Sequence, residues 1–222
     1  MNTASLFFNS SSAEQACTAC RLKHAFCFFV LMLLVACGDG ASFKPLSERS
    51  VILAFGDSLT YGSGASFKSS YPVVLEELTG IRVINAGVPG EVTAEGLRRL
   101  PNLLEQHQPN LVVLIHGGND MLRRMSRDAA ASNLEAMIAL IREAGAEVVI
   151  VGVPQPGLIL STAAFYGEVA EKTNTPIEKD VITDILQYRA NKADVVHPNA
   201  KGYRMLTEAV RQQLVEVGAL KD

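Results

Sequence analysis

A serine, an aspartate and a histidine in this sequence have the types and spacing that nucleophilic catalysis needs. Ser58 lies in the stretch FGDSLTYG, directly after the apolar run 51–54, which predicts a buried strand. Asp194 and His197 lie three residues apart in DVVHPN, so the carboxylate can bond one imidazole nitrogen and leave the other free. Pro198 biases His197 towards an extended backbone. A histidine oriented in this way can activate a serine hydroxyl as a nucleophile.

Two further stretches follow predicted strands and offer hydrogen-bond donors. Gly90, in NAGVPGEVT, has no side chain, so its backbone N–H can approach a substrate closely. Asn119, in HGGND, offers an amide donor after two glycines. Together with the N–H of Ser58, these groups could form an oxyanion hole. Taken alone, each of these residues is more often a turn, capping or surface residue; their joint occurrence at strand ends favours catalysis.

The elements that must position these residues alternate between apolar runs and amphipathic segments. The predicted strands are short, apolar and rich in β-branched residues, and cover 51–55, 81–84, 111–115 and 148–151, with a fifth near 175–177. The predicted helices cover 70–80, 93–107 (bent or restarted at Pro101), 126–145, 165–172 and a last helix from 199. This alternation predicts an α/β/α sandwich. Because parallel strands share one carboxyl edge, the loops described above can converge on Ser58.

The first 50 residues read as a leader rather than as part of the fold. Arg21 and Lys23 precede the uncharged, mostly apolar run 25–36, which is shorter than the 18 or so residues of a membrane span. This pattern predicts an export signal over residues 1–36. Leu34-Val35-Ala36-Cys37 resembles the lipobox of bacterial lipoproteins, which implies a lipid on Cys37. Residues 38–50 are polar and predict a linker, followed by one catalytic domain over 51–222.

Several other classes of function are disfavoured. The net charge of −3 does not suggest a nucleic-acid binder. Cys17 and Cys20 form a C-x-x-C, but both fall within the predicted signal together with Cys27, so neither a metal nor a cofactor is expected. The stretch GSGASFKSS superficially suggests a P-loop, but Phe67 stands directly before the lysine, where that motif needs glycine. His116, just before two glycines, is expected to be a partly buried, hydrogen-bonded histidine rather than a ligand.

The stretches FGDSLTYG, NAGVPGE, GGND and DVVHPN resemble the four signature blocks of the SGNH/GDSL hydrolase family over residues 51–214. The resemblance implies a flavodoxin-like three-layer α/β/α sandwich with five parallel strands. It also implies that Ser58 is the nucleophile and that Gly90 and Asn119 are oxyanion donors. Asp194 and His197 would then be the acid and the base. The sequence is most similar to bacterial periplasmic multifunctional esterases of the thioesterase–lysophospholipase type and to related arylesterases.

The resemblance and the predicted lipid anchor together predict a carboxylic ester hydrolase that works through an acyl-enzyme at Ser58. Lysophospholipids and other membrane-derived acyl esters are plausible substrates, while aryl esters, thioesters and acetylated sugars stay open. The protein is expected to be exported and lipid-anchored on the periplasmic side, with the outer membrane favoured because Asp39 is not adjacent to Cys37. The alternatives are a carbohydrate O-acetylesterase of the same fold and a lipoprotein that only binds acylated ligands.

Overall fold

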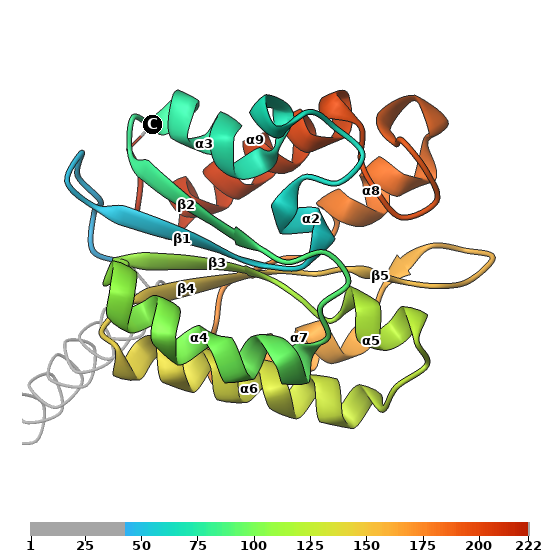
Figure 1. Ribbon diagram of the computed structural model, residues 1–222, viewed down its shortest axis with the longest axis horizontal. Helices are drawn as coiled ribbons and strands as arrows, with labels where there is room; N and C mark the ends of the chain where they lie inside the picture. The colour runs from blue at the N-terminus through green and yellow to red at the C-terminus, as the bar shows by residue number, and fades with distance from the viewer. Residues whose placement is uncertain (1–42, 222) are drawn as a thin grey trace, which may run out of the picture. The chain divides into compact units, whose positions relative to one another are not determined.

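A parallel sheet of five strands lies at the centre of the protein, in the order β2-β1-β3-β4-β7 (Figure 1). The computed structural model describes residues 43–221, so the predicted signal and Cys37 lie outside the described residues. The strands are β1 (Val51–Gly56), β2 (Arg82–Gly87), β3 (Leu111–Ile115), β4 (Glu147–Val151) and β7 (Ile177–Glu178).

The apolar runs form strands because both faces of the sheet are covered. Every residue of β3 is fully buried, and so are residues 52–55 of β1. The two strands pair in parallel, with Ile52 opposite Leu111 and Phe55 opposite Leu114. A strand with no solvated face gains from apolar side chains at every position, which is why these runs do not alternate with polar residues.

Helices form a layer on each side of the sheet, which confirms the predicted three-layer α/β/α sandwich. In Figure 1, α3, α8 and α9 lie on one side of the sheet, and α4, α6 and α7 lie on the other. These helices are α3 (Tyr71–Thr79), α4 (Thr93–His107), α6 (Arg127–Glu143), α7 (Ala164–Thr173), α8 (Val181–Gln187) and α9 (Ala200–Glu216). Within residues 43–221, none of the helices has both the length and the apolar character that crossing a bilayer requires.

Helix capping explains why two of the predicted helix starts are accurate. The Ser126 hydroxyl accepts the N–H of Ala129 at 3.2 Å, and the Asn199 side chain accepts the N–H of Gly202 at 3.1 Å. Each side chain satisfies a backbone donor that has no partner inside the helix. Shorter helical segments are α2 (Ser58–Tyr61) and α5 (Gly118–Leu122), with 3-10 turns at Phe67–Ser69 and Arg189–Asn191.

Some elements differ from the sequence prediction. Helix α4 continues through Pro101 without restarting, with the proline on its exposed side. Strand β2 lies at the edge of the sheet and extends to Gly87, beyond the apolar run that predicted it. The fifth strand is only Ile177–Glu178, slightly later than expected. Sequence analysis did not predict α8, nor the small antiparallel hairpin formed by β5 (Pro154–Gln155) and β6 (Ser161–Thr162).

The segment 43–50, expected as part of a linker, packs against the domain instead. Phe43 is buried in the main hydrophobic core, and its N–H donates to the carbonyl of Val217 at 2.7 Å. The N–H of Leu46 donates to the carbonyl of Ala219 at 2.8 Å. The chain therefore joins the domain beside the C-terminal end of α9. This is the edge where β1 begins, opposite the carboxyl ends of the strands (Figure 1).

This packing predicts that Phe43→Ala destabilises the domain. Removing a buried phenylalanine ring leaves a cavity, with a loss of about 3 kcal/mol in the free energy of unfolding. Urea denaturation measures the loss. The neighbouring exposed Lys44→Ala is the matched control and should change stability by less than about 0.5 kcal/mol. Equal stability of the two variants would show that the segment does not belong to the folded core.

Candidate active site

Ser58 is the first residue of α2 and lies directly beyond the end of β1. The carboxylate of Asp57 accepts the N–H of Leu59 at 3.0 Å and so caps this short helix. Asp57 itself is buried, and this burial raises the pKa of its carboxyl group. Asp57 therefore ties the turn together. The turn presents Ser58 at the carboxyl edge of the sheet.

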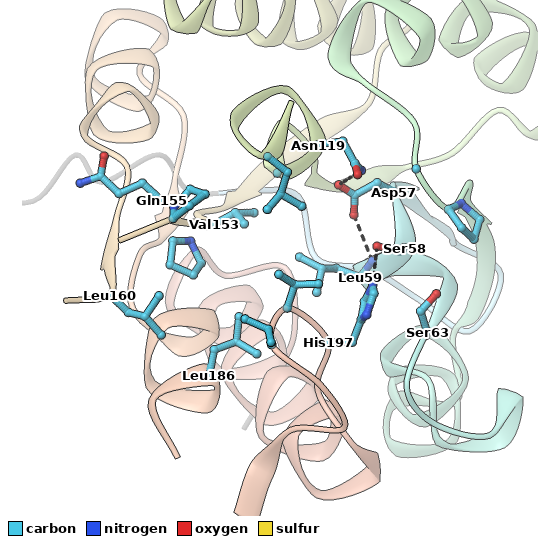
Figure 2. Close-up of a pocket in the computed structure, with 18 of the residues that line it drawn as sticks. Asp57, Ser58, Leu59, Ser63, Asn119, Val153, Gln155, Leu160, Leu186 and His197 are labelled. Carbon is cyan, nitrogen blue, oxygen red and sulfur yellow. Dashed lines mark hydrogen bonds between the residues drawn. The ribbon is translucent and has the colours of Figure 1, made fainter. Parts of the chain in front are cut away.

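The three residues predicted to act together do meet, although 139 positions separate Ser58 from His197. Figure 2 shows Ser58 and His197 side by side at the pocket. The Ser58 Oγ lies 3.0 Å from Nε2 of His197. The Nδ1 of His197 lies 2.7 Å from Oδ2 of Asp194. An ionised carboxylate only accepts hydrogen bonds, so Nδ1 carries the ring proton and Nε2 is left to accept from the serine hydroxyl.

The loop between Asp194 and His197 is organised by the aspartate itself. Its second oxygen, Oδ1, accepts the backbone N–H groups of Val196 and His197, both at 2.8 Å. Partial burial acts to raise the pKa of Asp194, but the hydrogen bonds from His197 and from the two backbone groups outweigh it and lower the pKa. The carboxylate therefore stays ionised and fixes both the loop and the orientation of the imidazole.

Two backbone donors face the pocket beside Ser58. Gly90 has a φ of 79°, a left-handed conformation that side chains disfavour, so glycine is needed at this turn. Ser58 and Gly90 both line the pocket. Among residues 43–221, neither of their N–H groups has a hydrogen-bond acceptor. Both donors are therefore available to a negatively charged oxygen formed next to Ser58.

Asn119 also lines the pocket, but its amide has other partners. Its Nδ2 donates to Oδ2 of Asp57 and to the carbonyl of Glu91, each at 3.0 Å. An asparagine amide has two hydrogens, so both are engaged in this structure. If Asn119 is to donate to an oxyanion, as predicted, one of its two amide hydrogens must be shared between its present acceptor and the oxyanion. Sequence analysis could not anticipate this competition.

A largely buried polar cluster, which we term the Glu91 cluster, lies behind these loops and consists of Glu91, Arg99 and His116. Arg99 Nε donates to Oε1 of Glu91 at 2.6 Å, and its Nη2 donates to Oε2 at 2.7 Å. The Nδ1 of His116 accepts the N–H of Gly117 at 3.0 Å, so Nε2 carries the proton and donates to Glu91 at 3.1 Å. His116 is hydrogen-bonded, as expected, but it is fully buried rather than partly buried.

Arg99 joins segments that are distant in the sequence. Beyond Glu91, its Nη2 donates to the carbonyls of Gly56 at 3.2 Å and Ala86 at 2.8 Å, at the ends of β1 and β2. Its guanidinium lies 4.2 Å from the centre of the Phe55 ring, a cation–π contact. Burial acts to raise the pKa of Glu91, but the bonds from His116 and Arg99 outweigh it and lower the pKa.

The Glu91 cluster also explains a glycine in the interior of α4. A Cβ added at Gly96 would collide with Nε2 of His116. Glycine in a helix interior costs about 1 kcal/mol relative to alanine, so its presence needs a packing reason. The close approach of α4 to His116 provides that reason. Sequence analysis missed Glu91 and Arg99, and the only signal was an acid in the second signature stretch.

The pocket itself is mostly apolar. It has a volume of about 410 Å³, with Ser58 and His197 on one side. Figure 2 shows Gln155 and Leu160, from the β5–β6 hairpin, across the pocket from Ser58. Leu59 and Val153 lie between these two sides. Among the described residues, no three acidic, histidine or cysteine side chains gather as metal ligands would. The arrangement can place an apolar group beside an activated serine.

The family model of the GDSL-like lipases and acylhydrolases matches residues 54–205, which contain the whole site. The chain belongs to this family. An arylesterase from Vibrio mimicus is 32% identical over 83% of this chain and 96% of its own length. The thioesterase 1/protease 1/lysophospholipase L1 of Escherichia coli is 29% identical over 76% of this chain and 85% of its own.

A solved structure agrees with this assignment. The psychrotrophic esterase EstA from Pseudoalteromonas, in a form inhibited by monoethylphosphonate, superposes with a TM-score of 0.68 at 25% identity. The match covers 76% of this chain and 98% of EstA. The predictions of an SGNH/GDSL hydrolase, of its parallel five-stranded α/β fold and of ester hydrolysis are therefore confirmed.

The Glu91 cluster predicts that Glu91→Gln destabilises this family member far more than loss of a surface ion pair would. Glu91 is 6% exposed and Arg99 25%, so the variant leaves a poorly solvated cation without its partner. We expect a loss of about 2–4 kcal/mol in the free energy of unfolding, measured by urea denaturation.

The matched control is Glu135→Gln, which removes the partner of the exposed Lys172. An exposed pair of this kind contributes about 0–1 kcal/mol. If Glu91→Gln cost no more than this control, the Glu91 cluster would not hold the loops of the site together.

Proposed function

We propose that this ester hydrolase forms an acyl-enzyme at Ser58 and acts on membrane-derived acyl esters. The observation that carries the proposal is the 3.0 Å contact between Ser58 Oγ and His197 Nε2, with Asp194 on the opposite ring nitrogen. In this proposal Ser58 is the nucleophile, His197 the general base and Asp194 the group that orients the base, and these contacts support the assignment.

The reaction begins when His197 Nε2 accepts the proton of the Ser58 hydroxyl as Oγ attacks the ester carbonyl. The carbonyl oxygen becomes negatively charged and accepts hydrogen bonds from the N–H groups of Ser58 and Gly90. The imidazolium, stabilised by Asp194, then gives its proton to the departing alcohol oxygen. Water attacks the acyl-enzyme in the same way, with His197 first accepting a proton from water and then returning it to Ser58.

Asn119 acts as a third oxyanion donor by sharing a hydrogen that now points to the carbonyl of Glu91. The bond to Asp57 is the one that is retained, since it satisfies a buried carboxylate, and bonds to charged groups are stronger than bonds between neutral groups. Asp57 also fixes the amide at the pocket wall. The backbone donors of Ser58 and Gly90 therefore supply most of the stabilisation, and Asn119 adds to it.

The apolar pocket favours substrates with a hydrocarbon or aromatic acyl group. Leu59, Val153, Leu160 and Leu186 line it, whereas a sugar would need several polar partners. The relatives support the same range, because one is named an arylesterase and the other a thioesterase and lysophospholipase. Lysophospholipids combine a single acyl chain with an ester, so they are the substrate class that we propose, and aryl esters serve as convenient assay substrates.

The place of action rests on the sequence. We propose that residues 1–36 direct export and that Cys37 carries a lipid anchor on the periplasmic side, with the outer membrane as destination. The apolar run 25–36 and the lipobox-like stretch 34–37 support this proposal. An enzyme held at a membrane meets lysophospholipids where they are generated.

The acyl-enzyme proposal predicts selective labelling of Ser58. A fluorophosphonate probe should label the wild-type protein, and Ser58→Ala should abolish both labelling and hydrolysis of an aryl acetate. Mass spectrometry of the labelled protein should place the adduct on the peptide containing Ser58. A probe adduct on another residue, with activity retained in Ser58→Ala, would refute the mechanism.

Asn119→Ala should lower kcat by up to about 100-fold with little change in KM, because it removes a donor that acts in the transition state. It should also lower stability, by about 1–3 kcal/mol, since buried Asp57 loses a hydrogen bond. Steady-state kinetics and urea denaturation measure the two effects.

The matched control is Asn133→Ala, which removes the amide bonded to Thr93 outside the pocket. This control should lose stability but keep its kcat. A rise in KM alone for Asn119→Ala would assign Asn119 to substrate binding.

Cys37→Ser should release an active enzyme from the membrane fraction, because stable attachment needs lipid chains on that residue. Fractionation of cells followed by an aryl acetate assay detects the change. Unaltered membrane association of the variant would mean that Cys37 carries no anchor.

A further inference from the structure

Exposed apolar side chains lie at the mouth of the pocket or close in sequence to residues that line it. We term this group the apolar rim; its members come from the last residue of α5 and from four loops at the carboxyl edge of the sheet, and are Val88, Leu122, Met125, Leu158, Ile159 and Val195. Leu122 and Val195 line the pocket itself, and the others lie close in sequence to residues that do. Apolar side chains that gather at a site in this way indicate a surface that is covered during function.

The tip of the β5–β6 hairpin is the most exposed part of the apolar rim. Leu158 is 107% exposed and Ile159 is 84% exposed, between pocket residues Gly157 and Leu160. In Figure 1 the loop that follows β5 projects beyond the end of the sheet. Residues 148–167 contain no charged side chain. Loop tips are normally polar, so an uncharged, projecting tip is suited to an apolar surrounding.

Arginines accompany the apolar rim on its α5 side. Residues 122–127 read Leu-Arg-Arg-Met-Ser-Arg, and all are exposed. Arg123 donates to the carbonyl of Gly90 at 2.6 Å. Within residues 43–221, the side chains of Arg124 and Arg127 have neither an ion pair nor a hydrogen bond. A guanidinium group matches the geometry of a phosphate, so these two side chains complement an anionic lipid head group.

Two acidic residues lie near these arginines and the mouth. Asp128 follows Arg127, and Asp194 stands beside Val195. The Asp194 carboxylate is already bonded to His197 and to two backbone N–H groups. Asp128 is exposed, but residues 122–128 carry three arginines against this one aspartate, so the net charge of the segment is positive, which favours an anionic partner.

We propose that the apolar rim docks on an anionic phospholipid surface, with Leu158 and Ile159 inserted among the acyl chains and Arg124 and Arg127 at the phosphates. Apolar side chains flanked by basic residues bind lipid interfaces in this manner. The pocket mouth then lies against the lipid, so a single acyl chain can reach Ser58 without crossing water. This inference rests on the proposed function for its substrate class, but docking itself requires no turnover.

The chain contains no tryptophan, so one introduced residue reports directly on lipid contact. In the full chain, Leu158→Trp should shift its fluorescence to shorter wavelength when vesicles of phosphatidylethanolamine and phosphatidylglycerol are added. Lipids with brominated acyl chains should quench it. The matched control is Leu78→Trp, an exposed apolar position in α3 next to the start of β2, away from the mouth. Its emission should not change.

Both tryptophan variants carry the same N-terminal residues, so a lipid anchor would affect them equally. Unchanged emission of Leu158→Trp would overturn the proposal, as would equal quenching of the two variants. The role of the arginines would be overturned if Leu158→Trp responded in the same way to vesicles of phosphatidylcholine alone, and if adding Arg124→Gln/Arg127→Gln did not diminish that response.

An activity measurement separates docking from catalysis. Leu158→Ser/Ile159→Ser should hydrolyse a water-soluble aryl acetate like the wild type, since neither side chain lines the pocket. On a lysophospholipid embedded in the same vesicles, its rate should fall by about tenfold, because the apolar contribution to lipid binding is lost. Equal rates on vesicles for variant and wild type would contradict docking. Absence of aryl acetate hydrolysis by the wild type would instead refute the proposed function.

Discussion

The ion pair between Arg99 and Glu91 is the interaction on which the geometry of the site depends. One guanidinium group bonds the carboxylate of the loop that carries Gly90, and also the carbonyls at the ends of β1 and β2. Those strand ends lead to Ser58 and to Gly90 respectively. The fork of donors on arginine allows one side chain to fix several acceptors at once, which a lysine could not do with the same geometry. Ser58 and Gly90 are thereby held in a fixed relative position.

The same region shows why a hydrolase of this kind places charge beneath its site. Asp57 is buried and its pKa is raised, so it is a source of instability unless its oxygens are satisfied. Leu59 and Asn119 supply the hydrogen bonds. In return, the carboxylate caps the helix that begins at Ser58 and holds the amide of Asn119 at the pocket wall. Stability and positioning thus depend on the same few bonds.

Sequence analysis predicted the features that depend on local chemistry and on the carboxyl edge that the strands of a parallel sheet share. Fully buried strands such as β3 are visible as apolar runs, and Ser126 and Asn199 mark helix starts by their capping oxygens. The meeting of Ser58 with His197 followed from the shared carboxyl edge and was found. These inferences need no knowledge of which side chains touch across long separations.

What the sequence did not reveal depends on tertiary contacts between residues of ordinary type. Glu91 and Arg99 are eight positions apart and look like surface charges of a loop and a helix, because nothing local shows that both turn inward. Strand β7 is too short to produce a periodic signal, and the β5–β6 hairpin is shaped by its neighbours. The competing bonds of the Asn119 amide could be found only from coordinates.

The packing of Phe43 beside Val217 fixes how the domain can sit on a surface. The chain enters at the edge of the sheet opposite Ser58. A tether from Cys37 would therefore be attached at that edge, whereas the pocket mouth opens at the carboxyl edge. From Cys37 to Phe43 the extended chain reaches about 20 Å, roughly the length of a six-residue strand such as β1. If Cys37 carries a lipid, a domain docked by its pocket mouth would therefore be tilted by this short tether, because the two attachments lie at opposite edges of the sheet. The length of such a tether would then limit how far the domain can tilt and which lipids the pocket mouth can reach.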